Sequence, residues 1–181
     1  MGCMRCRWCN QNNPVYVSYH DTQWAVPEHD DRMLFELLVL ESFQAGLSWE
    51  TVLNKRDNFR RAFDWMDPNI VCNYDGAKIE SLMQNSEIIR NRRKIEATVL
   101  NAGIFLKIAD EWGSFDAYIW HFTGNITIYE VNCTKSALSD RISADLKKRG
   151  MKFVGSTIIY SYLQAIGILY SHEPDCFLYK E

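Results

Sequence analysis

The sequence lacks the run of about 18 consecutive apolar residues that a membrane-spanning helix needs. It also lacks a basic segment followed by an apolar one near its start, so we predict neither a signal peptide nor membrane association. The chain is also not strongly basic, since its net charge is −3, whereas nucleic-acid-binding domains are often strongly basic. No repeat, low-complexity tract or flexible linker divides the chain. These absences favour a cytoplasmic monomer that folds as one compact unit over residues 1–181.

Two features of the composition are informative, the six cysteines and the clusters of basic residues. Without a secretion signal, the thiols are expected in a reducing compartment, where they are usually buried or bind a metal. Basic residues gather in three short stretches, each of which is either a solvated helix face or a contact for phosphate groups. These stretches are residues 55–61, 90–94 and 147–152.

Apolar residues recur at helical spacing through most of the chain, which predicts a mostly α-helical fold. Residues 3–24 show little periodicity, and we expect an irregular segment that is pinned to the rest. Residues 124–133 are expected to form a loop with a short extended piece. Helices are predicted over residues 31–45, 49–65, 68–73, 75–84, 88–112, 115–122, 136–149 and 154–170.

An acidic residue interrupts the apolar face of the helix predicted over residues 31–45. The stripe that includes Leu34 and Leu38 continues at helical spacing onto Glu41, which should therefore face the core. Burying a carboxylate without compensation costs several kcal/mol, so it must be neutral, paired or turned into a polar pocket. One interpretation is a structural Glu held by an Arg or a Trp N–H, and the other is a functional acid.

The residues that follow Glu41 favour the second interpretation, in which Glu41 is a functional acid. Gly46 can end the helix in a left-handed conformation, and Ser48 can cap a second helix that starts at Trp49. An acid and a large indole would then meet at a tight corner whose exposed tip is Gly46-Leu47. A pocket for a flat heterocycle needs an acceptor for its edge and an aromatic face to stack on.

Two further patterns suggest binding sites. Residues 149–157 read as two helices joined by a short hairpin between Gly150 and Gly155, either an ordinary turn or a phosphate-binding one, because backbone N–H groups at a helix start bind phosphate. The chain ends offer a Cys2His2 set with the ligand types of a closed zinc site. That set is Cys6, His20, His172 and Cys176. An iron–sulfur cluster on Cys3, Cys6, Cys9 and Cys176 is the alternative.

Several strings in this order resemble the bacterial 3-methyladenine DNA glycosylase I family, a branch of the helix-hairpin-helix glycosylases. The strings are Arg5-Cys6-x-Trp8, Tyr16-x-x-Tyr19-His20-Asp21-x-x-Trp24, Glu41-x-x-Gln44-Ala45-Gly46-Leu47-Ser48-Trp49, Lys147-Lys148-Arg149-Gly150-x-Lys152-Phe153-Val154-Gly155 and His172-x-x-x-Cys176. They extend over nearly the whole chain. The resemblance implies a helical glycosylase fold in which a structural zinc ties residues 1–30 and 170–181 to a helical core of residues 31–169.

The resemblance also implies roles for individual residues. Zinc would be bound by Cys6, His20, His172 and Cys176, although Cys9 could take the place of Cys6. The damaged base would lie among Tyr16, Tyr19, Trp24, Glu41 and Trp49, with Trp8 nearby. We expect Glu41 to be the chief functional carboxylate, either as a catalytic residue that activates water or as a group that only binds the base. DNA would be contacted by Gly46, Leu47, Gly150, Lys152, Gly155, Ser156 and Thr157.

The implied activity is hydrolysis of the N-glycosidic bond of 3-methyladenine in alkylated double-stranded DNA, with the free base as a product and no lyase step. No catalytic Asp follows a Leu-Pro-Gly-Val-Gly-like hairpin in this chain, which is why Glu41 is the predicted functional carboxylate. The family usually has Gly where this chain has Ala25, and a positive φ there would cost about 1 kcal/mol. The alternative to an enzyme is a binding protein, namely a non-catalytic helix-hairpin-helix DNA-binding module.

Overall fold

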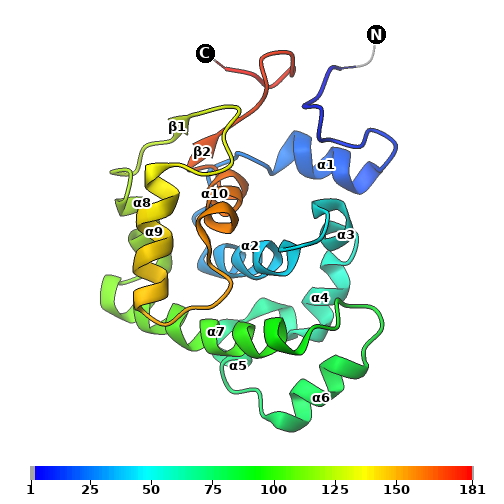
Figure 1. The fold of residues 1–181 in the computed structure, drawn as a ribbon, viewed down its shortest axis with the longest axis vertical. Coiled ribbons are helices and arrows are strands. Elements are labelled where there is room, and N and C mark those ends of the chain that lie inside the picture. The colour runs from blue at the N-terminus through cyan, green and yellow to red at the C-terminus, as the bar shows by residue number, and fades with distance from the viewer. Residues whose placement is uncertain (1–2, 181) are drawn as a thin grey trace.

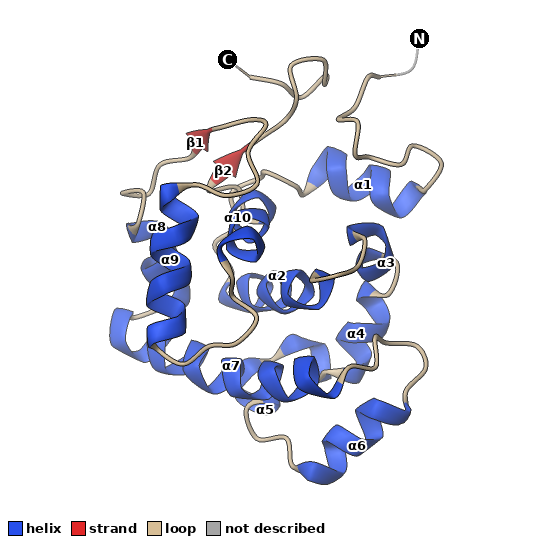
Figure 2. Cartoon of the chain, viewed as in Figure 1, coloured by secondary structure: helices blue, strands red, loops and turns tan. Residues whose placement is uncertain are grey.

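Helices form almost all of the regular structure in the computed structural model, which describes residues 3–180 (Figures 1 and 2). This confirms the predicted helical fold. The elements in chain order are α1 (Pro14–Thr22), α2 (Asp31–Gln44), α3 (Trp49–Leu53), α4 (Arg56–Ala62), the 3-10 turn η1 (Asp64–Met66), α5 (Pro68–Val71), α6 (Gly76–Gln84), α7 (Arg92–Trp112), α8 (Phe115–His121), β1 (Ile128–Tyr129), α9 (Ala137–Lys148), α10 (Ser156–Ala165) and β2 (Leu169–Tyr170).

Helix α2 lies in the middle of the molecule, with α3, α7, α8 and α10 packed around it (Figure 1). Every residue from 34 to 43 is buried, because neighbours cover this helix on all sides. A helix in that position is expected to be apolar around its whole circumference. Its two acidic residues in this stretch, Glu36 and Glu41, are therefore exceptions that need an explanation.

The helix ends follow the capping signals of the sequence. The side chain of Asp30 accepts a hydrogen bond from the N–H of Met33 at the start of α2, and Ser48 accepts one from Thr51 at the start of α3. Gly46 has a φ of 81° after the end of α2, as predicted, and Gly113 has a φ of 87° after α7. Gly46 and Ser48 fix the short connection between α2 and α3.

Three predictions of local structure were wrong. Residues 3–24 contain the helix α1, which starts at Pro14 and is capped by the side chain of Asn13, a signal that the weak periodicity concealed. The helix predicted over 49–65 is broken after Leu53 and ends in left-handed residues at 64–66. The helix predicted over 154–170 stops at Ala165, because Gly167 takes a φ of 75° and leads into β2.

The two short strands bring distant parts of the chain together. β1 and β2 pair in parallel, with Ile128 opposite Leu169. The N-terminal and C-terminal segments also meet, since the N–H of Phe177 donates to the carbonyl of Met4 over 2.8 Å. Within residues 3–180, no helix is long and apolar enough to cross a membrane.

Candidate active site and metal centre

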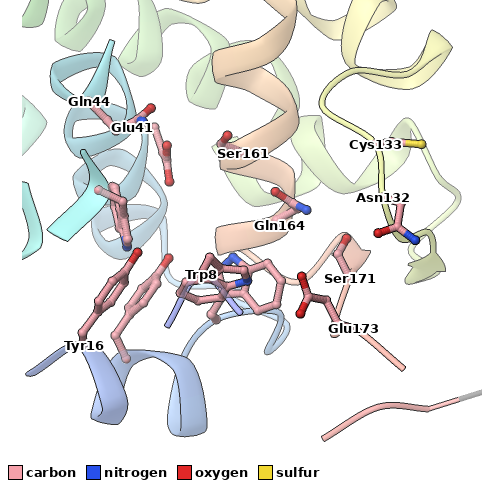
Figure 3. A pocket seen from close by; sticks show the side chains of 13 residues that line it. Trp8, Tyr16, Glu41, Gln44, Asn132, Cys133, Ser161, Gln164, Ser171 and Glu173 are labelled. Carbon is pink, nitrogen blue, oxygen red and sulfur yellow. The ribbon is translucent and has the colours of Figure 1, made fainter. Parts of the chain in front are cut away.

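A cavity of about 300 Å³ opens between α1, α2, α3 and α10 (Figure 3). All six residues that were predicted to surround a base line it: Trp8, Tyr16, Tyr19, Trp24, Glu41 and Trp49. They are spread over residues 8–49, so the fold gathers them from separate helices and loops. The sequence therefore predicted which residues meet here, while their roles stay predictions.

Aromatic rings form much of the cavity wall. The indole of Trp8 lies 5.4 Å from the Tyr16 ring and 4.7 Å from the Trp24 ring, between ring centroids. On the other side, the rings of Tyr19 and Trp49 are 5.3 Å apart. Rings at these separations pack against one another and hold their neighbours in place. The wall is thus a rigid apolar surface of the kind on which a flat heterocycle can stack.

Glu41 is the acidic residue of this cavity, and its side chain has no hydrogen-bond partner among residues 3–180. It is 4% exposed, and its burial raises the pKa of the carboxyl group to about 8. Glu36, one and a half turns earlier on α2, is buried too, but it forms ion pairs with Arg56 and Arg60. The structural interpretation of Glu41, a carboxylate held by an Arg or a Trp N–H, is therefore wrong, and it describes Glu36 instead.

Three polar atoms on the cavity wall also lack partners within the described chain. They are the hydroxyls of Tyr19 and Ser171 and the indole Nε1 of Trp49, all fully buried. Burial raises the pKa of Tyr19 well above its ordinary value and that of Tyr16 to about 12, so both phenols keep their protons at neutral pH. Buried donors are normally satisfied. Unsatisfied donors beside an unpaired acid indicate a site that is completed by a polar ligand.

Other lining residues were not predicted. Gln44 lies on α2 three residues after Glu41, so helical spacing could have placed it on the same face. The others come from α10 and from two loops, and no pattern in the sequence connects them with Glu41. They are Asn132, Cys133, Ser161, Gln164, Ser171 and Glu173 (Figure 3).

The corner between α2 and α3 carries an exposed apolar tip. The N–H of Leu47 donates to the carbonyl of Gln44 over 2.7 Å, which closes a tight turn through Gly46. Leu47 is 40% exposed although it is a large apolar residue. The predicted exposed tip is thus present, three residues beyond the end of the helix that carries Glu41.

The α9–α10 connection is a tight hairpin, as predicted. Gly150 has a φ of 101°, a conformation that a residue with a side chain rarely adopts, and Gly155 precedes α10. No side chain caps the start of α10, so backbone N–H groups at Ser156 and Thr157 are not occupied by a capping residue. The side chain of Lys152 is exposed between the two glycines.

The two ends of the chain bring four potential metal ligands together. Cys6, His20, His172 and Cys176 are all buried, and their ligand atoms lie within 4.8 Å of one another. The Cys6 Sγ and Cys176 Sγ atoms are each 3.5 Å from His172 Nδ1, and Cys176 Sγ is 3.6 Å from His20 Nε2. Tetrahedral zinc with bonds of about 2.3 Å to sulfur and about 2.0–2.1 Å to nitrogen separates such atoms by about 3.6 Å. The donor set therefore fits zinc.

Neighbouring groups orient these ligands. The Nδ1 atom of His20 lies 2.7 Å from Asp21, whose carboxylate also accepts two hydrogen bonds from the guanidinium of Arg5. The Arg5 guanidinium lowers the pKa of Asp21, so the carboxylate stays ionised and His20 turns its Nε2 atom to the cluster. Cys9 lies outside the cluster, with its thiol 3.9 Å from the carbonyl of Tyr16. Of the two N-terminal candidates, Cys6 is the one in the cluster.

Fold and site together define a class of helical protein with a buried acid in a cavity walled by aromatic rings. Comparison with known proteins identifies the family. The model of the family described as Methyladenine glycosylase matches residues 8–179. DNA-3-methyladenine glycosylase 1 of Escherichia coli (strain K12) is 43% identical over 182 residues, covering 97% of this chain and 96% of that protein. The chain therefore belongs to the methyladenine glycosylase family, as the sequence motifs predicted.

Solved structures agree with this assignment. A crystal structure of 3-methyladenine DNA glycosylase I superposes with a TM-score of 0.93 at 42% identity, covering 98% of this chain and all of that one. A structure of the Staphylococcus aureus enzyme, described as the structural basis of 3-methyladenine recognition, gives a TM-score of 0.92 at 35% identity over 97% of each chain. The fold described above is thus the fold of these glycosylases.

Proposed function

We propose that this protein excises 3-methyladenine from alkylated double-stranded DNA by hydrolysing the N-glycosidic bond, which leaves an abasic site and the free base. The observation that carries the proposal is Glu41, a buried and unpaired acid in a cavity walled by aromatic rings. Relatives over nearly the full chain are named DNA-3-methyladenine glycosylases, and one solved relative is described for recognition of this base.

The chemistry follows from the charge of the damaged base. Alkylation at N3 makes adenine in DNA cationic and a good leaving group, so the enzyme needs little acid catalysis. Its main tasks are to extract the nucleotide from the duplex and to discriminate the damaged base from normal ones. In the cavity, Trp49 and a Tyr ring stack on the base, while the Glu41 carboxylate accepts hydrogen bonds from its edge. Water then attacks the sugar carbon.

The raised pKa of Glu41 explains how the site distinguishes a cationic base from a neutral one. A carboxyl group with a pKa of about 8 is mostly protonated in the empty cavity at neutral pH. A cation beside it favours the ionised form, because opposite charges attract strongly where water is excluded. Undamaged adenine lacks the positive charge and gains no such ion pair. The buried acid therefore stabilises the methylated base selectively.

DNA is held by two exposed segments in this proposal. Leu47, at the Gly46 turn, fills the gap in the duplex that the flipped nucleotide leaves. The Gly150–Gly155 hairpin acts as a helix-hairpin-helix element, in which Lys152 and the N–H groups of Ser156 and Thr157 bind phosphates. A non-catalytic DNA-binding module would use the same segments, but it would not need Glu41 unpaired beside Trp49.

The Cys6, His20, His172 and Cys176 cluster holds zinc in a structural role. The metal supplies a positive charge that stabilises the buried thiolates and joins the two ends of the chain. Residues 3–30 and 170–180 are thereby fixed on the helical core of residues 31–169, and the chain works as one unit. We further infer that the protein acts as a cytoplasmic monomer.

Release of free 3-methyladenine from methylated duplex DNA tests the proposal. Glu41→Gln should lose at least about a hundredfold in release rate, in the range for removal of one buried group that stabilises charge in the transition state, while binding to an abasic-site duplex is retained. Glu80→Gln makes the same chemical change on the surface, where Glu80 pairs with Arg92, and should leave release unchanged. A folded, zinc-loaded wild type that binds DNA but releases no base would contradict the enzyme and favour the binding module.

A further inference from the structure

Helix α7 carries a row of buried polar side chains that the site described above does not use. Lys94, Thr98 and Asn101 are spaced at i, i+4 and i+7, which places them on one face of the helix. All three are buried, and Lys94 is only 6% exposed. Burying a lysine or an asparagine is unfavourable unless its polar atoms find partners. The partners therefore show what the row does.

Lys94 binds the end of α2. Its Nζ atom donates to the carbonyl of Phe43 over 2.8 Å and to that of Ala45 over 2.7 Å. Carbonyls at a helix C-terminus have no partner within the helix, and a cation there also complements the helix dipole. These two carbonyls lie within the three residues before Gly46, and Ala45 directly precedes it. Lys94 therefore fixes the start of the exposed corner.

Asn101 binds the α9–α10 hairpin. Its amide nitrogen donates to the carbonyl of Lys152, and its amide oxygen accepts from the N–H of Lys152, both over 2.9 Å. One side chain thus satisfies both polar backbone groups of a single hairpin residue. The next residue, Phe153, has a φ of 55°, so the hairpin has an uncommon backbone conformation that these bonds support.

A third contact closes the arrangement. The hydroxyl of Ser42 on α2 donates to the carbonyl of Phe153 over 3.1 Å, so α2 and the hairpin are also joined directly. The ammonium group of Lys94 lies 6.0 Å from the ring centres of both Phe43 and Phe153. Figure 1 shows the α9–α10 connection running close to α2 and α7. Corner, hairpin and α7 are therefore linked in a closed loop of contacts.

We propose that Lys94 and Asn101 are positioning residues that hold the Gly46–Leu47 corner and the Gly150–Gly155 hairpin at a fixed separation, so that both meet damaged DNA as one rigid surface. This inference rests on the proposed function, because it assumes that both segments contact DNA. Two contacts held in register cost less ordering on binding than two contacts that must each be ordered separately. Lys94 and Asn101 thus increase affinity for DNA without touching it.

The first measurement is affinity for an abasic-site duplex beside affinity for free 3-methyladenine. In zinc-loaded protein, Lys94→Met and Asn101→Leu should each weaken duplex binding by about tenfold, while the dissociation constant of the free base changes by less than about twofold. Thr98→Val is the matched control, because among residues 3–180 the Thr98 hydroxyl bonds only to the carbonyl of Lys94 in its own helix. It should leave both affinities unchanged. Equal losses of duplex and base binding would overturn the inference, because they indicate general destabilisation.

The second measurement is the coupling between the two surfaces. Leu47→Ala and Lys152→Ala remove the proposed contacts themselves. Their effects on duplex binding should be non-additive in the wild-type background and closer to additive once Asn101→Leu has removed the two bonds between α7 and Lys152. Additive effects in both backgrounds overturn the inference while the proposed function stands. If neither direct variant weakens duplex binding, the proposed DNA surface is wrong and the inference fails with it.

If Lys94→Met and Asn101→Leu prevent folding, the milder variant Ser42→Ala still tests the inference. Ser42→Ala removes only the hydroxyl that joins α2 to Phe153, apart from a bond within α2 to Leu38. It should weaken duplex binding by about threefold and reduce the coupling between Leu47→Ala and Lys152→Ala. Unchanged duplex affinity and unchanged coupling in a folded Ser42→Ala protein overturn the inference.

Discussion

Glu36 and Glu41 stand on the same buried helix, and their surroundings give the two carboxyl groups different properties. Glu36 is paired with two arginines, whereas the described chain offers Glu41 no partner, and burial raises the pKa of Glu41 to about 8. Between its ordinary pKa of 4.5 and this value, the folded protein retains a proton that the unfolded chain releases. The Glu41 contribution to the free energy of unfolding therefore falls as the pH rises through this range.

Glu41→Gln should abolish that pH dependence. The amide cannot ionise, so the variant gains stability relative to the wild type as the pH rises from about 5 to about 8, by roughly 3–5 kcal/mol. Urea unfolding of both proteins across this pH range measures the difference between their free energies of unfolding. The contributions of all other titrating groups cancel in that difference. Glu80→Gln should run parallel to the wild type. A constant difference between Glu41→Gln and wild type would show that Glu41 is ionised throughout.

The same residue predicts the pH dependence of activity. Because the ionised carboxylate pairs with the cationic base, kcat/KM for methylated DNA should rise with pH and level off near the pKa of about 8. In Glu41→Gln the remaining activity should lack this rise. Initial rates of base release at constant ionic strength provide the measurement. An identical rise in both proteins would assign the titration to another group.

Single residues were also where the sequence was most informative. Glu41 was predicted to be buried because it continues an apolar stripe, and Ala25 was predicted to strain the chain if its φ were positive, which it is, at 63°. Both inferences need only local spacing or a known family position. That Glu41 lacks a partner and Glu36 has two could not be predicted, because Arg56 and Arg60 reach α2 through tertiary packing.

At the scale of elements, the sequence predicted the long helices and missed the short or interrupted ones. Helix α2 has a clear cap at each end, so its bounds follow from Asp30 and Gly46. Helix α1 has nine residues and is stabilised mainly by packing, which periodicity does not record. The end of α10 depends on Gly167, whose role is visible only when its neighbours are known.

Gly167→Ala should strongly destabilise the protein. A Cβ at this position would lie 2.3 Å from the carbonyl carbon of Val26 and 2.4 Å from the nitrogen of Pro27, and the φ of 75° is itself unfavourable for alanine. Since both clashing atoms belong to the backbone, we expect a loss of more than about 3 kcal/mol. Thermal unfolding measures it. Gly76→Ala is the control, because nothing lies within 4 Å of a Cβ there, and it should change stability by less than about 1 kcal/mol.

At the scale of the whole molecule, the cluster of Cys6, His20, His172 and Cys176 joins the chain ends to the cavity wall. The Trp8 ring lies 5.2 Å from His20, and the Trp24 ring lies 4.8 Å from His172, so two wall residues pack directly on proposed zinc ligands. The sequence predicted the four ligands from residue type and family resemblance. It could not predict this contact, because the two ends of the chain meet only in the folded structure.

Removal of the metal should therefore lower both stability and base affinity. A metal present at a thousand times its dissociation constant adds about 4 kcal/mol, which for a chain of this size corresponds to roughly 10 °C in Tm. Chelation or Cys176→Ser should produce a loss of this order and weaken binding of free 3-methyladenine, whereas Cys9→Ser should do neither, since Cys9 lies outside the cluster. Metal analysis should find one zinc per chain in a colourless protein. Visible absorbance with bound iron would contradict zinc and favour the iron–sulfur alternative, and an unchanged Tm after complete zinc removal would contradict the structural role.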